Sequence, residues 1–251
     1  MQQEASCFDR NKLSDEDIKR AWIPLSACID TAKEENSLAN EVAYYHGLED
    51  WEMRFVSFNF TNILDGYVES FAEKGIQHPN ADNYGCKVTV DRDVLYIHGK
   101  FGSAVIGVHN SDQIDNRQFR TNGQCSNLIK SKIIENGGRD WYRQGEQAIR
   151  ESTFICLYGV SLGETDTHWW EIITQWLCDD AEHILIIYWH YRDKMTGTLD
   201  QDSEAKNDAR QKFMRYVDGW FLRKRIADTA LRRRIMKQIC ILPIRLKDTT
   251  K

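Results

Sequence analysis

Two uninterrupted apolar runs in the second half of the chain restrict its fold more than any other feature. The runs are Thr153–Tyr158 and Ile184–Trp189, and runs of this kind are typical of strands buried on both faces of a parallel sheet. Between them, Trp169, Ile173 and Leu177 recur at the spacing of an amphipathic helix. A strand, a helix and a second strand in this order predict a βαβ unit. The expected fold class is therefore α/β, with a mostly parallel sheet flanked by helices.

The first half of the chain alternates between helical and extended patterns. Residues 14–54 are expected to be helical, beginning with a capping sequence at Ser14–Asp17. Arg54–Phe60 is rich in β-branched and aromatic residues and predicts a strand, after which apolar residues return at helical spacing from Ile63 to Phe71. Further short strands are expected at Lys87–Val90, Val94–Ile97, Ala104–Val108 and Ile239–Leu242.

We interpret residues 1–251 as one α/β domain with three successive parts. A helical N-terminal segment, residues 1–53, precedes a core of strands and helices at residues 54–190. Residues 191–251 form a basic helical region that ends in the last strand.

The composition argues against several classes of protein. Seven cysteines are scattered without a C-x-x-C pair, which disfavours a disulfide framework and a structural zinc site, and no metal is expected. No apolar run approaches the ~18 residues that a membrane span needs, and the opening residues lack the apolar centre of a signal peptide. We therefore expect a cytoplasmic protein without a membrane partner.

Polar residues follow three of the predicted strands. They are Asn59–Asn62, His98–Gly99 and Gly159–Asp166, and in open parallel sheets ligands bind beyond the carboxyl ends of the strands. Each cluster also has a purely structural interpretation, because asparagine forms turns and histidine bonds to nearby backbone. Thr165 or Asp166 would likewise serve as the N-cap of the following helix. Their shared position at one edge of the sheet favours a ligand site.

The order of these motifs resembles the AbiH family of bacteriophage abortive-infection proteins. The matching segments are Phe58–Asn62, Ile97–Gly99, Ile106–His109 and Tyr158–Asp166. The resemblance implies a Rossmann-like domain and a role in antiphage defence, with a homo-oligomer or a phage-derived trigger as expected partners.

The same segments are similar to sirtuin-like NAD-binding domains, and this resemblance implies a site for NAD as substrate. Asn59 would orient the nicotinamide end or a water molecule, and His98 would be the general base, since imidazole has a pKa near neutrality. Asp166 would hold the loop or bond to a ribose. The resemblance assigns cofactor binding to Thr61, Asn62, Gly99, Gly159, Ser161 and Leu162.

Both families open with a strand and a glycine-rich turn that holds the pyrophosphate. Here Cys7-Phe8-Asp9 stands in a charged stretch, and no glycine precedes Gly47. Two expectations stay open: an N-terminally truncated relative, or a relative that no longer binds a dinucleotide and acts as a non-catalytic sensor.

A serine hydrolase is an alternative, because Gly159–Gly163 satisfies the G-x-S-x-G pattern of a nucleophile elbow. Ser161 would be the nucleophile, with His183 or His190 and Asp166 or Asp180 as its partners. The predicted helix begins several residues after the serine, however, whereas the elbow requires it to begin there.

A binding module is a further alternative. Residues 206–237 contain eleven lysine and arginine residues and three aspartates, and a basic amphipathic helix can neutralise nucleic-acid phosphates. The same pattern also fits a helix that packs on the sheet and exposes a basic face to solvent.

Overall fold

The computed structural model describes most of the chain in segments. These are residues 14, 28–75, 86–100, 107–108, 110–121, 125–126, 128–130, 132–133, 140–191 and 199–245. The expected helix after Ser14, His109 and most of the expected strand Ala104–Val108 lie outside the described residues.

The βαβ unit predicted from the apolar runs is present. Strands β5 (Phe154–Leu157) and β6 (Ile184–Tyr191) pair in parallel, with Cys156 opposite Ile186, and α9 (Thr167–Asp179) connects them. Strand β7 (Ile239–Arg245) adds to β6, also in parallel, and gives the order β5-β6-β7.

The burial of the two apolar runs differs from the prediction. The first four residues of β6 are at most 1% exposed, as expected for a strand covered on both faces. Three of the four residues of β5 are only half-buried. Among the described residues β5 has one partner strand, so it lies at an edge of this sheet.

Four short strands form two further parallel pairs. β1 (Trp51–Met53) pairs with β3 (Val88–Val90), and β2 (Val56–Ser57) pairs with β4 (Leu95–Tyr96). Helix α4 (Ile63–Lys74) connects the two chain segments, as the sequence predicted. The expectation that residues 14–54 are entirely helical is wrong at Trp51–Met53, because these residues extend and bond to β3 after a 3-10 turn, η2 (His46–Leu48).

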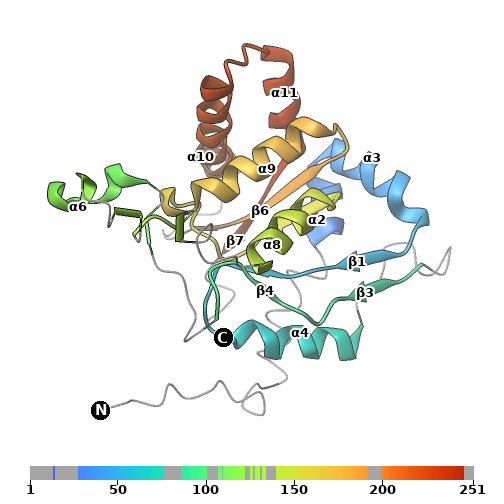
Figure 1. The fold of residues 1–251 in the computed structure, drawn as a ribbon. Coiled ribbons are helices and arrows are strands. Elements are labelled where there is room, and N and C mark those ends of the chain that lie inside the picture. The colour runs from blue at the N-terminus through green and yellow to red at the C-terminus, as the bar shows by residue number, and fades with distance from the viewer. Residues whose placement is uncertain are drawn as a thin grey trace.

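Helices cover both faces of the β5-β6-β7 sheet (Figure 1). On one face, α2 (Cys28–Glu35) and α3 (Ser37–Tyr45) bury Ala32 and Val42 against β6 and β7. Asn36 ends α2 and caps α3, since its side-chain oxygen accepts hydrogen bonds from the first amides of α3. On the other face, α9 and α10 (Leu199–Lys224) enclose the main core.

The main core is aromatic and joins the strand groups. The tryptophans of α9, Trp169, Trp170 and Trp176, are each 1% exposed. Ile97, which follows β4, belongs to the same core, and α8 (Asp140–Arg150) packs between β4 and α9. The structure is thus α/β, with parallel strands flanked by helices. Shorter helical segments are η3 (Ser111–Gln113), α6 (Arg117–Thr121) and η5 (Glu164–Asp166).

The basic region is not one helix over residues 206–237 but two helices, and α11 (Thr229–Gln238) runs beside α10 (Figure 1). The break has a local cause. Arg225 adopts a left-handed φ of 58°, and the Ile226 amide donates to the Phe221 carbonyl, which closes the end of α10. Asp228 then caps α11 by accepting a hydrogen bond from the Leu231 amide at 2.8 Å. None of the helices in the described part of the chain is long and apolar enough to cross a membrane.

Candidate functional site

Two of the predicted catalytic residues meet in space although 68 positions separate them. His98, after β4, and Asp166, at the start of α9, approach to 2.9 Å between Nε2 and Oδ1. His98 is 8% exposed. The contact therefore joins the carboxyl end of β4 to the helix that follows β5, as the clustering of strand-end motifs predicted.

A third residue, Lys130, completes this group. Its Nζ donates to the same Oδ1 of Asp166 at 2.9 Å, and its side chain is 17% exposed. Burial alone would raise the pKa of Asp166, but the hydrogen bonds from His98 and Lys130 and the positive charge of Lys130 lower it to about 2. Asp166 is therefore a carboxylate at neutral pH.

The ionised state of Asp166 fixes the roles of the two imidazole nitrogens. A carboxylate can only accept hydrogen bonds. Nε2 of His98 therefore carries a hydrogen atom and donates a hydrogen bond to Asp166. The other nitrogen, Nδ1, is buried and has no hydrogen-bond partner among the described residues. A buried polar atom without a partner is costly, and such an atom is suited to receive a ligand.

The loop from Gly159 to Asp166 is held through its backbone. Lys212 donates to the carbonyl of Ser161 at 2.7 Å, and Tyr216 donates to that of Leu162 at 2.8 Å. Gly159 and Leu162 adopt positive φ angles of 69° and 49°, which for leucine is a strained conformation. Because the Leu162 side chain is 1% exposed, it lies in the core and its contact with a ligand would have to use the backbone.

Asn59 lies at the same edge as His98 but does not touch it. The pairing of Ser57 with Tyr96 places residues 59 and 98 at equivalent positions beyond β2 and β4. The Asn59 side chain is exposed, and the backbone N–H of Asn59 donates to the Ser57 hydroxyl at 3.1 Å. Thr61 and Asn62 are half-buried, and in the described structure neither they nor Asn59 form a side-chain hydrogen bond with His98 or Asp166.

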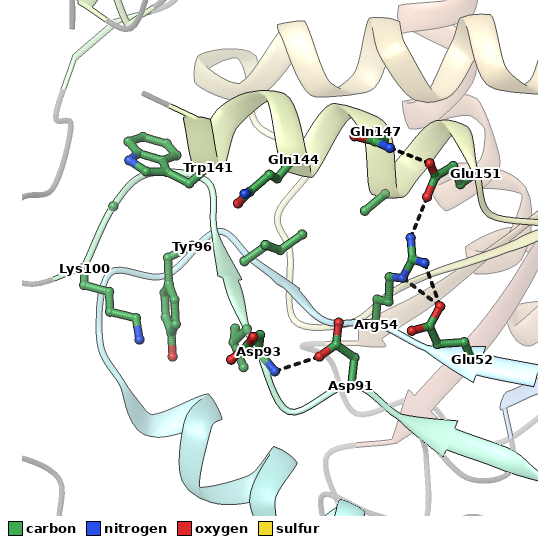
Figure 2. Close-up of a pocket in the computed structure, with 14 residues that line it drawn as sticks. Glu52, Arg54, Asp91, Asp93, Tyr96, Lys100, Trp141, Gln144, Gln147 and Glu151 are labelled. Atoms are coloured by element: carbon green, nitrogen blue, oxygen red, sulfur yellow. Dashed lines mark hydrogen bonds and ion pairs between the residues drawn. The ribbon is translucent and has the colours of Figure 1, made fainter. Parts of the chain in front are cut away.

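A separate cavity of about 710 Å³ lies beside β4 and beneath α8 (Figure 2). In Figure 2, Arg54 points between two carboxylates, and it bonds to Glu52 and Glu151 at 2.6 Å each. The other charged residues of the lining are Asp91, Asp93 and Lys100. Of the predicted site residues, Gly99 alone belongs to the described lining. The excess of carboxylates disfavours a pyrophosphate here, so we place the candidate site at His98.

Comparison with known proteins identifies the family. A family model for bacteriophage abortive infection, AbiH, matches residues 14–189. The chain belongs to the AbiH family. Neither a curated protein nor a solved structure matches it.

Two residues in contact with the His98–Asp166 pair were absent from the prediction of the candidate site. Lys130 lies in a polar stretch without a recognisable motif, next to the isolated bridge between Val108 and Ile129, so no sequence signal identified it. Phe58 was part of the motif that suggested the family, but it had no role assigned. Its ring lies edge-on to His98 at 5.7 Å and stacks on Trp170 at 5.3 Å.

No serine hydrolase arrangement forms around Ser161 among the described side chains of this AbiH chain, and the side chain of His190 lies outside them. Helix α9 begins at Thr167 rather than at the serine. His183 precedes β6, at the opposite end of the sheet from Ser161, and it stacks on Trp176 at 4.4 Å. Asp166 is bound to His98 and Lys130.

Among the described residues no group of three or more histidine, cysteine or acidic side chains could hold a metal ion.

Proposed function

We propose that this AbiH chain acts in abortive infection by binding NAD and hydrolysing its bond between nicotinamide and ribose. The observation that carries the proposal is the state of His98. Its imidazole is held by an ionised carboxylate through Nε2, and its buried Nδ1 has no partner among the described residues. This combination is what a general base needs: a fixed ring and a nitrogen reserved for the reacting group.

The reaction assigns one proton transfer to the protein. Water adds to the anomeric carbon of the nicotinamide-bearing ribose while the carbon–nitrogen bond breaks, and the electron pair of that bond stays on the nicotinamide nitrogen. Nδ1 of His98 accepts the proton lost by the water. The products are nicotinamide, ADP-ribose and a proton that later leaves the imidazole. Glycosidic cleavage passes through an oxocarbenium-like transition state, so alignment of water and ribose is the main requirement.

The charges around this edge suit an anionic dinucleotide. Helices α4 and α9 both begin here, and the positive ends of helix dipoles favour phosphate. Asn62 stands at the N-cap position of α4 without a capping hydrogen bond from its side chain. Lys130 adds a positive charge next to Asp166.

The test is incubation of the purified protein with NAD, with nicotinamide and ADP-ribose followed by chromatography. We expect release by wild type and by His46→Ala, a matched control in which a surface histidine paired with Glu182 is removed. His98→Ala should abolish release, and Asn59→Ala should reduce it. The assay is repeated with phage lysate to supply a trigger.

Absence of release under both conditions would contradict the hydrolase. Calorimetric titration of NAD into wild type and Lys130→Gln then separates a protein that binds NAD without cleaving it from one that does not recognise it. A protein that does not recognise NAD would favour the alternative of a sensor that acts through a partner.

A further inference from the structure

The paired helices α10 and α11 concentrate positive charge on an acidic protein. Residues 206–237 contain eleven lysine and arginine residues and three aspartates, a net charge of +8, whereas the whole chain carries −5. The rest of the molecule is therefore strongly acidic. An uneven distribution of this size creates a field that orients the molecule toward an anionic partner.

Several of these cations hold the fold together. Arg232 bonds to Asp218 through two nitrogens, and Arg223 pairs with Glu171 at 2.6 Å. Arg234 donates to the carbonyl of Cys178 at 2.6 Å. Lys206 pairs with Glu35, and Lys212 donates to the candidate-site loop. Their charges are compensated, or they are committed to contacts within the protein.

Five other cations are exposed and have no acidic partner among the described residues. We call them the basic hairpin surface: Arg215, Lys224, Arg225, Arg233 and Lys237. None of these five side chains forms a hydrogen bond or an ion pair in the described structure, which sets them apart from the five paired cations.

The unpaired cations lie on the side of the hairpin that faces solvent. In α10, Phe213, Val217 and Phe221 are at most 6% exposed and face the core, which places Arg215 on the opposite side of the helix. Lys224 and Arg225 stand at the tip, where α10 ends. In α11, Arg233 and Lys237 are one turn apart and both exposed.

We propose that the basic hairpin surface binds the phosphate backbone of double-stranded nucleic acid. Three of its five residues are arginines, whose planar guanidinium groups bond to phosphate through two nitrogens. One large apolar side chain, Leu222, is 80% exposed beside the tip, and a single leucine gives too little apolar area for insertion into a membrane. The acidic remainder of the protein repels the same backbone, so the duplex meets this hairpin first.

The experiment is fluorescence anisotropy with a labelled DNA duplex of about 30 base pairs, titrated between about 50 and about 200 mM salt. The test variant is the triple substitution Arg215→Gln, Arg225→Gln and Arg233→Gln. The matched control is Lys87→Gln, Arg143→Gln and Arg150→Gln, which removes the same charge from exposed positions away from the hairpin. Circular dichroism establishes that both variants fold.

We expect wild type and the control to bind with similar affinity at low salt. The hairpin variant should bind roughly ten-fold or more weakly, and the slope of log affinity against log salt should fall by about three, one for each phosphate contact removed. No binding by wild type, or an equal loss in the control, would overturn the proposal. Binding to vesicles that contain phosphatidylserine, without competition from the duplex, would make a lipid surface the partner and also overturn it. The outcome is independent of the NAD proposal, because the side-chain partners of His98 in the described structure, which are Asp166 and Phe58, do not include any residue of the basic hairpin surface.

Discussion

Substitution of Asp166 by asparagine tests the electrostatics of the site through the stability of the fold. The pKa of Asp166 is lowered from its ordinary value of 3.8 to about 2, because the hydrogen bonds from His98 and Lys130 and the positive charge of Lys130 outweigh the effect of burial. A difference of this size corresponds to about 2.4 kcal/mol, at about 1.4 kcal/mol for each pH unit. The carboxylate is 19% exposed, so solvent screening reduces the expected loss in Asp166→Asn to about 1–2 kcal/mol at neutral pH.

The pH dependence identifies the cause of this loss. A carboxylate whose pKa is lower in the folded protein stabilises the fold above the unfolded value and loses this effect as pH falls through the folded value. The difference between wild type and Asp166→Asn should therefore be fully present above about pH 5 and shrink to about half near pH 3. Urea unfolding followed by tryptophan fluorescence measures it, with Glu164→Gln as the control for an exposed acid in the same loop. An equal difference at every pH would refute the electrostatic explanation and leave altered packing as the cause.

Substitutions at four further positions test the packing and the helix ends by urea or thermal unfolding. Gly145→Ala places a methyl group 2.7 Å from Cγ2 of buried Ile97 and should destabilise the fold by about 1–3 kcal/mol. The new methyl of Gly219→Ala meets its nearest neighbour at 3.5 Å. This substitution should instead stabilise α10 by about 0.5–1 kcal/mol. A gain in the first or a loss in the second would contradict these geometries. Asp228→Ala removes the cap of α11 and should cost about 1 kcal/mol, whereas Asp228→Asn should restore most of it. Ile186→Ala empties a fully buried position in β6 and should cost about 2–5 kcal/mol; a smaller loss would mean that the sheet core relaxes around the cavity.

The sequence predicted the elements whose pattern is decided locally. Strands β5 and β6 follow from continuous apolar runs, and α4 and α9 follow from apolar residues at helical spacing. Strand β1 was missed because Trp51–Met53 is short and follows a helical segment. Its extension is decided by pairing with Val88–Val90, which lies far along the chain, and such pairing leaves no local signal.

The sequence predicted the candidate site as residues at the ends of strands, and this was enough to expect His98 and Asp166 at the same edge of the sheet, where they form a hydrogen bond. The same prediction was not sufficient for Lys130, whose contribution depends on where a loop places one side chain. The division of the basic region into two helices was missed for a related reason. Arg225 carries no glycine-like signal, yet it adopts the left-handed conformation that ends α10.

Asp166 does not follow the usual preference of an N-cap aspartate. It stands at the N-cap position of α9, where an aspartate ordinarily accepts a hydrogen bond from the first helical amides, but its side chain makes no capping bond. The carboxylate bonds to His98 and Lys130 instead. Leu162, four residues earlier, holds a left-handed φ in the same loop. Deviations from local conformational preference are common at functional sites. Here both deviations lie in the loop that carries Asp166, the hydrogen-bond partner of His98. The forgone cap and the strained leucine are therefore two signs of one constraint, the need to deliver a carboxylate to the imidazole.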